Sequence, residues 1–181
     1  MKVTETKLKG CFIIEPAIFG DERGYFFESF NKQKFNELTG AEIDFVQDNE
    51  SYSTKGVLRG LHFQKRDFAQ AKLVRVSHGN VLDVAVDIRK HSLTFGQHIS
   101  IELSSENKKQ LFVPRGFAHG FIVLSDTVTF LYKCDNLYNQ ASEGGIIYND
   151  QELNINWKLP EKDFIISPKD TVLPTLAEAK L

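Results

Sequence analysis

Short runs of β-branched and aromatic residues recur along this chain and are separated by turn residues. Two of them, residues 72–77 and 81–88, flank the turn His78-Gly79-Asn80. Many short strands at close spacing are typical of a β-sandwich or barrel, so we predict an all-β fold. One helix is expected at residues 31–38, between a polar start and Gly40 as a stop. The other expected strands cover residues 25–30, 57–64, 97–103, 110–113, 120–124 and 128–133.

Alternation along residues 57–64 predicts which of their side chains share a face. It places His62 with Leu58 and Gly60, and it places Arg59 on the opposite face. A polar side chain that faces a barrel interior is costly to bury unless something binds there. We therefore expect a ligand near His62.

Two histidines, His62 and His119, lie among apolar, strand-forming residues with glycine and arginine close by. Histidine is the side chain best suited to exchange a proton near neutral pH, so the two histidines suggest one shared pocket. The chain has no His-x-His, His-x-x-x-His or Cys-x-x-Cys pattern, and no metal site is expected. A buried, hydrogen-bonded structural histidine is the alternative interpretation of His62.

Lysine, tyrosine and arginine residues add candidates for chemistry. Lys72 begins an otherwise apolar strand, and Tyr132 is placed to act as a general acid. The simpler interpretations are a solvated lysine and a tyrosine at the edge of the core. Arg23, Arg59 and Arg115 could bind phosphate because the guanidinium fork matches phosphate oxygens, although a single arginine is usually a surface residue.

Composition limits the classes of partner. The net charge of −2 argues against a nucleic-acid surface. No run approaches the roughly eighteen apolar residues of a membrane span, and the N-terminal residues do not form the apolar core of a signal peptide. Cys11 and Cys134 are too few for a disulfide framework. We therefore expect a cytoplasmic protein that binds neither nucleic acid nor membrane.

Six motifs, in this order, resemble those of the dTDP-4-dehydrorhamnose 3,5-epimerase family. They are FGDERG (19–24), RGLHFQ (59–64), VAVDIR (84–89), TFG (94–96), VPRGFAHGF (113–121) and SPKD (167–170). The resemblance runs from about residue 10 to about residue 176. It implies one cupin-like β jelly-roll domain over residues 1–181, activity without a metal or other cofactor, and a homodimer.

The resemblance also implies roles for individual residues. His62 corresponds to the general base, Asp170 to the carboxylate that orients it, and Tyr132 to the acid on the opposite face of the sugar. Lys72 corresponds to the cation that stabilises the enolate oxygen. Asp83 is a competing partner for His62, and this choice stays open. The positions that correspond to the substrate pocket are Arg23, Phe26, Glu28, Gln47, Asn49, Arg59, His119 and Tyr138.

The implied reaction is inversion at C3 and C5 of dTDP-4-dehydro-6-deoxy-D-glucose, a dTDP-4-keto-6-deoxyhexose, to give dTDP-4-dehydro-L-rhamnose. The resemblance extends to epimerases that act at only one of these carbons. A sugar-nucleotide-binding cupin without catalysis is a further alternative, which the intact set of His62, Lys72 and Tyr132 disfavours. The missing histidine pair disfavours a metal-dependent cupin oxygenase.

Overall fold

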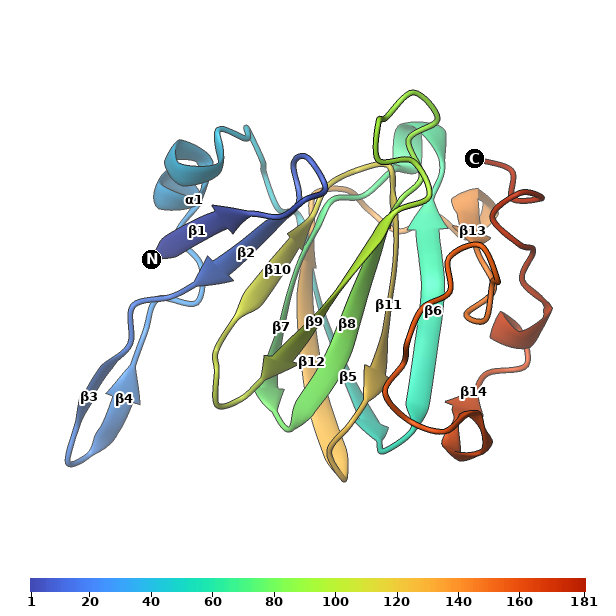
Figure 1. The fold of residues 1–181 in the computed structure, drawn as a ribbon. Coiled ribbons are helices and arrows are strands. Elements are labelled where there is room, and N and C mark those ends of the chain that lie inside the picture. Colours follow the sequence, from blue (N-terminus) through green and yellow to red (C-terminus); the bar gives the residue numbers. More distant parts are fainter.

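Two large β-sheets form the body of the protein in the computed structural model, which describes residues 1–181 (Figure 1). In spatial order, the first sheet contains β1 (Lys2–Glu5), β2 (Phe12–Glu15), β10 (Gln110–Val113), β7 (Lys72–His78), β12 (Thr127–Cys134) and β5 (Gln47–Thr54). The second contains β13 (Glu143–Gly145), β6 (Val57–Gln64), β11 (Phe117–Val123), β8 (Asn80–Asp87) and β9 (His98–Ser104), with β14 (Ile165–Ile166) parallel to β6. The predicted all-β jelly roll is confirmed.

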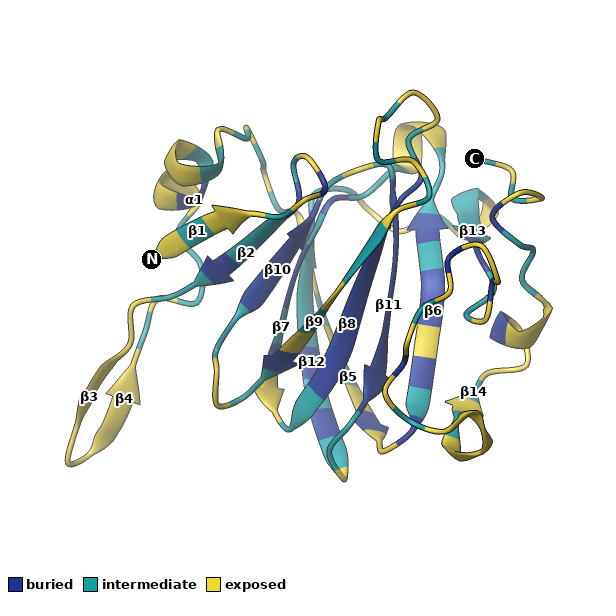
Figure 2. Cartoon of the chain, in the orientation of Figure 1, coloured by how far each residue is buried: buried dark blue, intermediate teal, exposed yellow.

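Apolar side chains from both sheets meet between them. This interior core includes Val74, Phe130, Val81, Leu103 and Phe121. A second core covers the outer face of the second sheet, where the C-terminal segment contributes Ile146, Trp157 and Leu176. Figure 2 shows the central strands β8, β10 and β11 almost wholly buried. The four short 3-10 helices are η1 (Arg66–Phe68), η2 (Gln140–Ser142), η3 (Glu161–Asp163) and η4 (Asp170–Val172).

The single α-helix, α1 (Lys32–Thr39), confirms the helix predicted from the sequence. The side chain of Asn31 accepts a hydrogen bond from the backbone of Lys34, and Gly40 ends the helix with φ +68°. Phe35 is the buried residue of the helix, and its ring meets Phe112 edge-on at 5.1 Å. The helix therefore packs on the outer face of the first sheet.

The strand predicted at residues 25–30 is much shorter than expected. β3 (Phe19–Asp21) and β4 (Gly24–Phe26) form a separate hairpin that projects from the body of the molecule (Figure 1). The chain leaves the strand conformation after Phe26, and Phe30 packs its ring against Phe45, at 5.2 Å, beside the helix. The aromatic residues predicted to form one strand therefore divide into two groups: Tyr25 and Phe26 belong to the hairpin, and Phe30 packs beside the helix.

The predicted alternation of β6 is wrong around Gly60. Leu58, Leu61 and Phe63 all contribute to the outer core, which a strict period of two does not allow. The pairing of β6 with β11 shifts register at this point, and Gly60 has φ +123°. A Cβ there would lie 2.7 Å from the Cα of Gly120, so only glycine fits.

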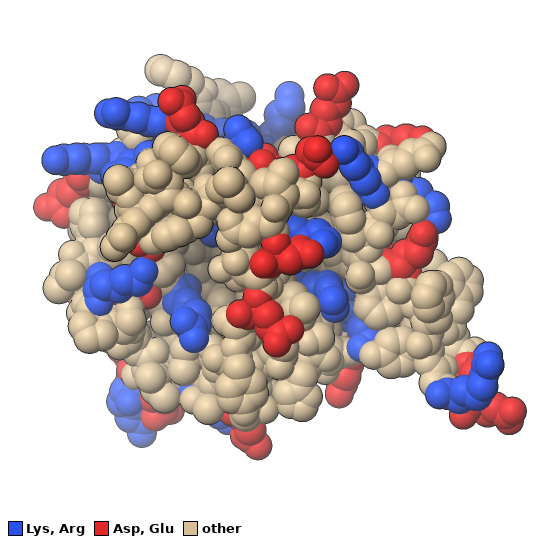
Figure 3. Space-filling view, turned by 180° about the vertical axis from the view of Figure 1, so that it is seen from behind, with Lys and Arg blue, Asp and Glu red and all other residues tan.

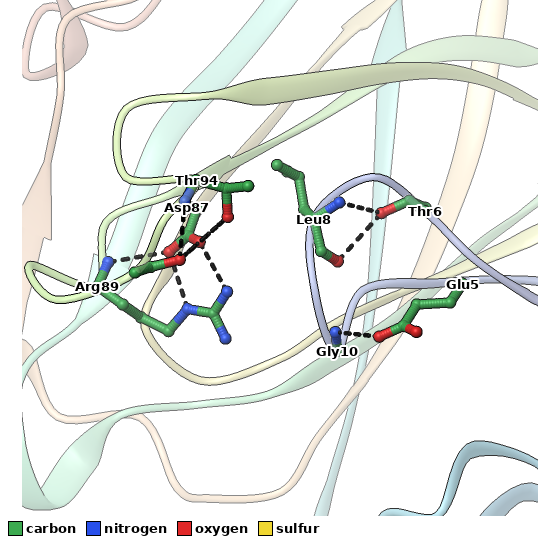
Figure 4. Close-up of polar contacts among 8 residues, drawn as sticks. Glu5, Thr6, Leu8, Gly10, Asp87, Arg89 and Thr94 are labelled. Carbon is green, nitrogen blue, oxygen red and sulfur yellow. Dashed lines mark hydrogen bonds and ion pairs between the residues drawn. The ribbon is translucent and has the colours of Figure 1, made fainter.

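A buried carboxylate fixes the loop that follows β8. Asp87 accepts hydrogen bonds from the Arg89 guanidinium, at 2.8 and 2.6 Å, and from the hydroxyls of Ser92 and Thr94, both at 2.6 Å (Figure 4). Burial alone would raise the pKa of Asp87, but these hydrogen bonds outweigh it and hold the pKa far below its usual range. The carboxylate thus organises the connection between β8 and β9.

Surface charge and the cysteines match an ordinary globular domain. Lys, Arg, Asp and Glu are interspersed on the face in Figure 3, in agreement with the small net charge. None of the helices combines the length and the apolar character that a membrane-spanning helix needs. Cys11 and Cys134 are buried and unpaired, and burial raises the pKa of their thiols to about 12 and about 11.

Candidate active site

One cavity of about 630 Å³ opens between the two sheets and contains the proposed reacting groups. β6 contributes Arg59 and His62, although their alternation predicted opposite faces. Both line the cavity because of the irregularity at Gly60. The remaining predicted residues in the wall are Lys72 from β7, His119 from β11, Tyr132 from β12, and Tyr138 and Asp170 from the C-terminal part of the chain.

His62 forms a dyad with Asp170, 108 residues away in the chain. Nε2 of His62 lies 2.7 Å from Oδ1 of Asp170, and the Gly60 N–H lies 3.3 Å from Oδ2. Burial would raise the pKa of Asp170, but the hydrogen bond and charge of His62 lower it overall. An ionised Asp170 only accepts, so Nε2 carries a hydrogen and Nδ1 of His62 is left free to take a proton.

Asp83, the competing partner for His62, is bonded to His119 instead. Its two carboxylate oxygens lie 3.0 and 2.9 Å from Nε2 of His119. His119 and His62 are opposite each other in the antiparallel pairing of β11 with β6. Side chains at such positions lie on the same face of a sheet. The site therefore contains two neighbouring Asp–His pairs.

Lys72 and Tyr132 lie near each other in the cavity wall. Nζ of Lys72 is 5.9 Å from the centre of the Tyr132 ring, and Lys72 forms no ion pair. Burial lowers the pKa of Lys72, and the negative charge of Asp83 offsets part of this effect. Burial raises the pKa of Tyr132, so its phenol keeps its proton at neutral pH. No protein group bonds the Tyr132 hydroxyl, which is free to act on a ligand.

The predicted binding residues on β5 and β6 are held by local hydrogen bonds. The guanidinium of Arg59 donates to the Ser53 hydroxyl at 3.1 and 3.2 Å. Gln47 donates to Asn49 at 2.9 Å and accepts from the backbone of Tyr138 at 3.2 Å. These bonds link the strand to the exposed Tyr138 ring at the cavity edge.

Four of the predicted arginine, aromatic and acidic residues lie outside this cavity. Arg23 and Phe26 belong to the projecting hairpin, where Arg23 pairs with Asp21. Glu28 bonds Lys34 at 2.6 Å. Arg115, a sequence candidate for phosphate binding, instead pairs with Asp135 at 2.7 Å.

Two charged residues of the cavity wall were missed in the sequence. Lys169 donates to Glu143 at 2.9 Å, and the Tyr138 hydroxyl lies 3.2 Å from the same carboxylate. Lys169 directly precedes Asp170 in the SPKD motif, so its place beside a predicted catalytic residue could have identified it as a residue of the site. Glu143 begins β13, and no local pattern distinguishes it from other surface acids.

The cavity has the groups that proton transfer needs. A free imidazole nitrogen, a protonated phenol and an unpaired ammonium group face one space. They can remove a proton, return one and stabilise a developing negative charge. No group of three or more His, Cys, Asp or Glu side chains is placed to hold a metal ion.

Comparisons with known proteins agree with this arrangement. A sequence model of the family described as dTDP-4-dehydrorhamnose 3,5-epimerase matches residues 5–178. The chain is 54% identical over 184 residues to the dTDP-4-dehydrorhamnose 3,5-epimerase of Salmonella typhimurium, covering 100% of this chain and 98% of the relative.

Two crystal structures are also close in fold. The dTDP-4-dehydrorhamnose 3,5-epimerase of Elizabethkingia anophelis has a TM-score of 0.96 and 58% identity, over 98% of this chain and 97% of the other. The dTDP-6-deoxy-D-glucose-3,5-epimerase of Legionella pneumophila, in complex with dTDP-4-keto-L-rhamnose, has a TM-score of 0.94 and 50% identity, over 98% and 93%.

Proposed function

The chain belongs to the dTDP-4-dehydrorhamnose 3,5-epimerase family, and we propose from its cavity how it inverts C3 and C5 of dTDP-4-dehydro-6-deoxy-D-glucose. One observation carries the mechanism. The His62–Asp170 dyad, Lys72 and Tyr132 line the same cavity between the sheets.

His62 acts as the general base. The 4-keto group acidifies the hydrogens on the adjacent carbons, and Nδ1 of His62 removes one of them. Asp170 accepts from Nε2, which fixes the tautomer and stabilises the imidazolium that forms. The same base serves both C3 and C5.

Lys72 and Tyr132 complete the inversion. Negative charge moves to the 4-oxygen as the enolate forms, and the ammonium group of Lys72 stabilises it. The absence of an ion pair at Lys72 supports this role: the nearby charges of Asp83 and Glu143 favour the charged form of Lys72, but neither carboxylate forms a salt bridge with it. Tyr132 then donates its phenolic proton to the carbon from the opposite face. After the inversion, His62 releases the proton it took to solvent, and the Tyr132 phenolate takes one up, so both residues return to their starting states.

The nucleotide part binds at the edge of the cavity. Arg59 supplies paired donors for the diphosphate, and its bond to Ser53 leaves part of the guanidinium available. The exposed ring of Tyr138 is a stacking partner for thymine, held in place by Gln47. Asn49 supports this arrangement by accepting a hydrogen bond from Gln47.

Proton NMR of dTDP-4-dehydro-6-deoxy-D-glucose in deuterated buffer tests the function. We expect deuterium at both C3 and C5, together with the inverted product. Deuterium at only one carbon would identify a single-centre epimerase. No incorporation at either carbon would reject proton transfer at this site.

We further propose that two copies of the chain form a homodimer that shares its sites. The hairpin of β3 and β4 leaves Phe19 and Phe26 about two-thirds exposed, at 66% and 65%. Such aromatic exposure on a projecting hairpin is costly in a monomer and suits a partner surface. In the dimer, Arg23, Phe26 and Glu28 would reach the nucleotide end of the neighbouring cavity.

Mixing two inactive variants tests this arrangement. Arg23→Ala removes a hairpin contact, and His62→Ala removes the base, so each homodimer is impaired. A mixed dimer contains one site with both parts intact, and random mixing should restore about a quarter of wild-type activity. Absence of any recovery, or a fully active monomer by light scattering, would contradict the shared site.

A further inference from the structure

Asp83 is a buried carboxylate for which the proposed reaction assigns no role. Its side chain is fully buried, and both oxygens contact one group, Nε2 of His119. No other protein donor bonds it. A carboxylate without contact to water is costly unless it is well partnered, so this contact matters for the state of His119.

The position of Asp83 is rigid. β8 is paired on one side with β11 and on the other with β9, so Asp83 lies on an interior strand of the second sheet. Ala85 is directly opposite His119, which makes Asp83 the diagonal neighbour of His119 on the same face. The His119 ring also stacks near Phe130, with centres 6.3 Å apart and planes 27° apart.

These contacts determine which nitrogen of His119 faces the cavity. An ionised carboxylate can only accept hydrogen bonds, so Nε2 must carry the hydrogen. In the neutral imidazole, Nδ1 is then an acceptor. His119 lines the cavity, and no protein group bonds its Nδ1.

The cavity otherwise offers few free acceptors to a sugar. Arg59 and Lys72 can only donate. The carboxylates of Asp170 and Glu143 already accept from protein groups. Nδ1 of His62 is reserved for the carbon-bound proton in the proposed mechanism. The hydroxyl oxygens of Ser51 and Tyr132 are also without a protein partner, but each can donate as well as accept. Nδ1 of a neutral His119 is the unoccupied group that can only accept, so it suits a sugar hydroxyl that donates.

We propose that Asp83 is a positioning residue which, through His119, presents Nδ1 as the acceptor for a hydroxyl of the sugar. This inference rests on the proposed function, because it assigns the sugar to this cavity. It makes the Asp83–His119 pair a determinant of sugar recognition, distinct in task from the His62–Asp170 dyad beside it.

The tautomer of His119 is the first test, and it does not depend on activity. Two-bond ¹⁵N–¹H correlation NMR of the histidine-labelled wild-type protein should show His119 with hydrogen on Nε2 and not on Nδ1. A His119→Gln sample assigns the signal. Hydrogen on Nδ1 would overturn the proposal, whether or not any variant of Asp83 folds.

Ligand binding to Asp83→Asn is the second test. The amide can accept from Nε2 or donate to it, so it no longer fixes the tautomer. We expect affinity for dTDP-glucose, which lacks the reactive ketone, to fall about 3- to 10-fold, the size of one hydrogen bond to a neutral group. Affinity for dTDP, which lacks the sugar, should be unchanged. Equal losses for both ligands would show general damage to the pocket and reject the proposal.

A double-mutant cycle closes the argument. If Asp83 acts through His119, the Asp83→Asn change should alter dTDP-glucose affinity by less than about twofold in the His119→Gln background. Additive effects of the two changes would overturn the proposal. Failure of the wild-type protein to incorporate deuterium would instead reject the proposed function, while these tautomer and binding results would still report on Asp83.

Discussion

Replacing Tyr132 by Phe should separate proton removal from inversion. The change deletes one oxygen and keeps the ring that packs near Phe130, at 6.2 Å, and near Lys72. If Tyr132 is the acid, His62 still removes the proton, and solvent returns it on the same face. Deuterium exchange should then persist while the inverted product forms slowly.

The size of the effect follows from the surroundings of the hydroxyl. No protein group bonds it, so its removal leaves no buried partner unsatisfied. The free energy of unfolding should change by less than about 0.5 kcal/mol. General acid catalysis is worth about 10²-fold or more, so the rate of inversion should fall by at least that factor, about 2.7 kcal/mol in activation free energy.

The assay follows deuterium uptake and product formation in one NMR sample. Tyr148→Phe is a matched control, because its hydroxyl bonds Glu161 in the C-terminal segment, outside the cavity. We expect this control to exchange and invert at wild-type rates. Equal loss of exchange and inversion in Tyr132→Phe would indicate a binding role. Wild-type rates for both would refute the two-sided mechanism.

Three further predictions concern the base, the metal and the fold. His62→Ala should abolish exchange at both carbons while calorimetry shows dTDP affinity nearly intact; substantial remaining uptake would mean that another base acts. Turnover should survive exhaustive chelation, because His62 and His119 each give Nε2 to a carboxylate and no metal cluster is formed; loss with EDTA and rescue by a divalent metal would overturn this. Asp87→Asn should lower the free energy of unfolding at pH 7 by about 2 kcal/mol, because charge-assisted hydrogen bonds are weakened. The pKa of Asp87 is depressed in the folded protein, so the difference in unfolding free energy between wild type and Asp87→Asn should have its full size above the ordinary carboxyl pKa and shrink as pH falls below about 4. A difference that grows as the pH is lowered would refute this expectation.

The strongly patterned elements of the fold could be predicted from the sequence. Helix α1 was predictable because its capping residues, Asn31 and Gly40, stand at its two ends in the sequence. Apolar strands such as β8 were predictable from their β-branched residues. β5 was missed because its residues, QDNESYST, are nearly all polar. Strand pairing with β12 along its whole length, from Gln47 to Thr54, overrides that weak propensity.

The geometry of the site was harder to predict than its members. Nothing in the spacing joins His62 to Asp170 or gives Asp83 to His119, because both pairs are made by strands and turns that are distant in the chain. Arg59 and His62 were wrongly predicted to lie on opposite faces, because the irregularity at Gly60, between them, shifts the alternation of the residues that follow it. Tertiary pairing, rather than local pattern, decides these contacts.

Because both of its cysteines are buried, the wild-type protein should react little with thiol-labelling reagents. The thiolate is the reactive form, and the raised pKa of Cys11 and Cys134 leaves almost none of it at neutral pH. A single new cysteine, such as Leu93→Cys at a fully exposed loop position, should therefore be the one residue that maleimide labels. A second label placed by Glu22→Cys at the hairpin tip would let distances between probes report where the hairpin docks, with every native residue of the cavity left in place.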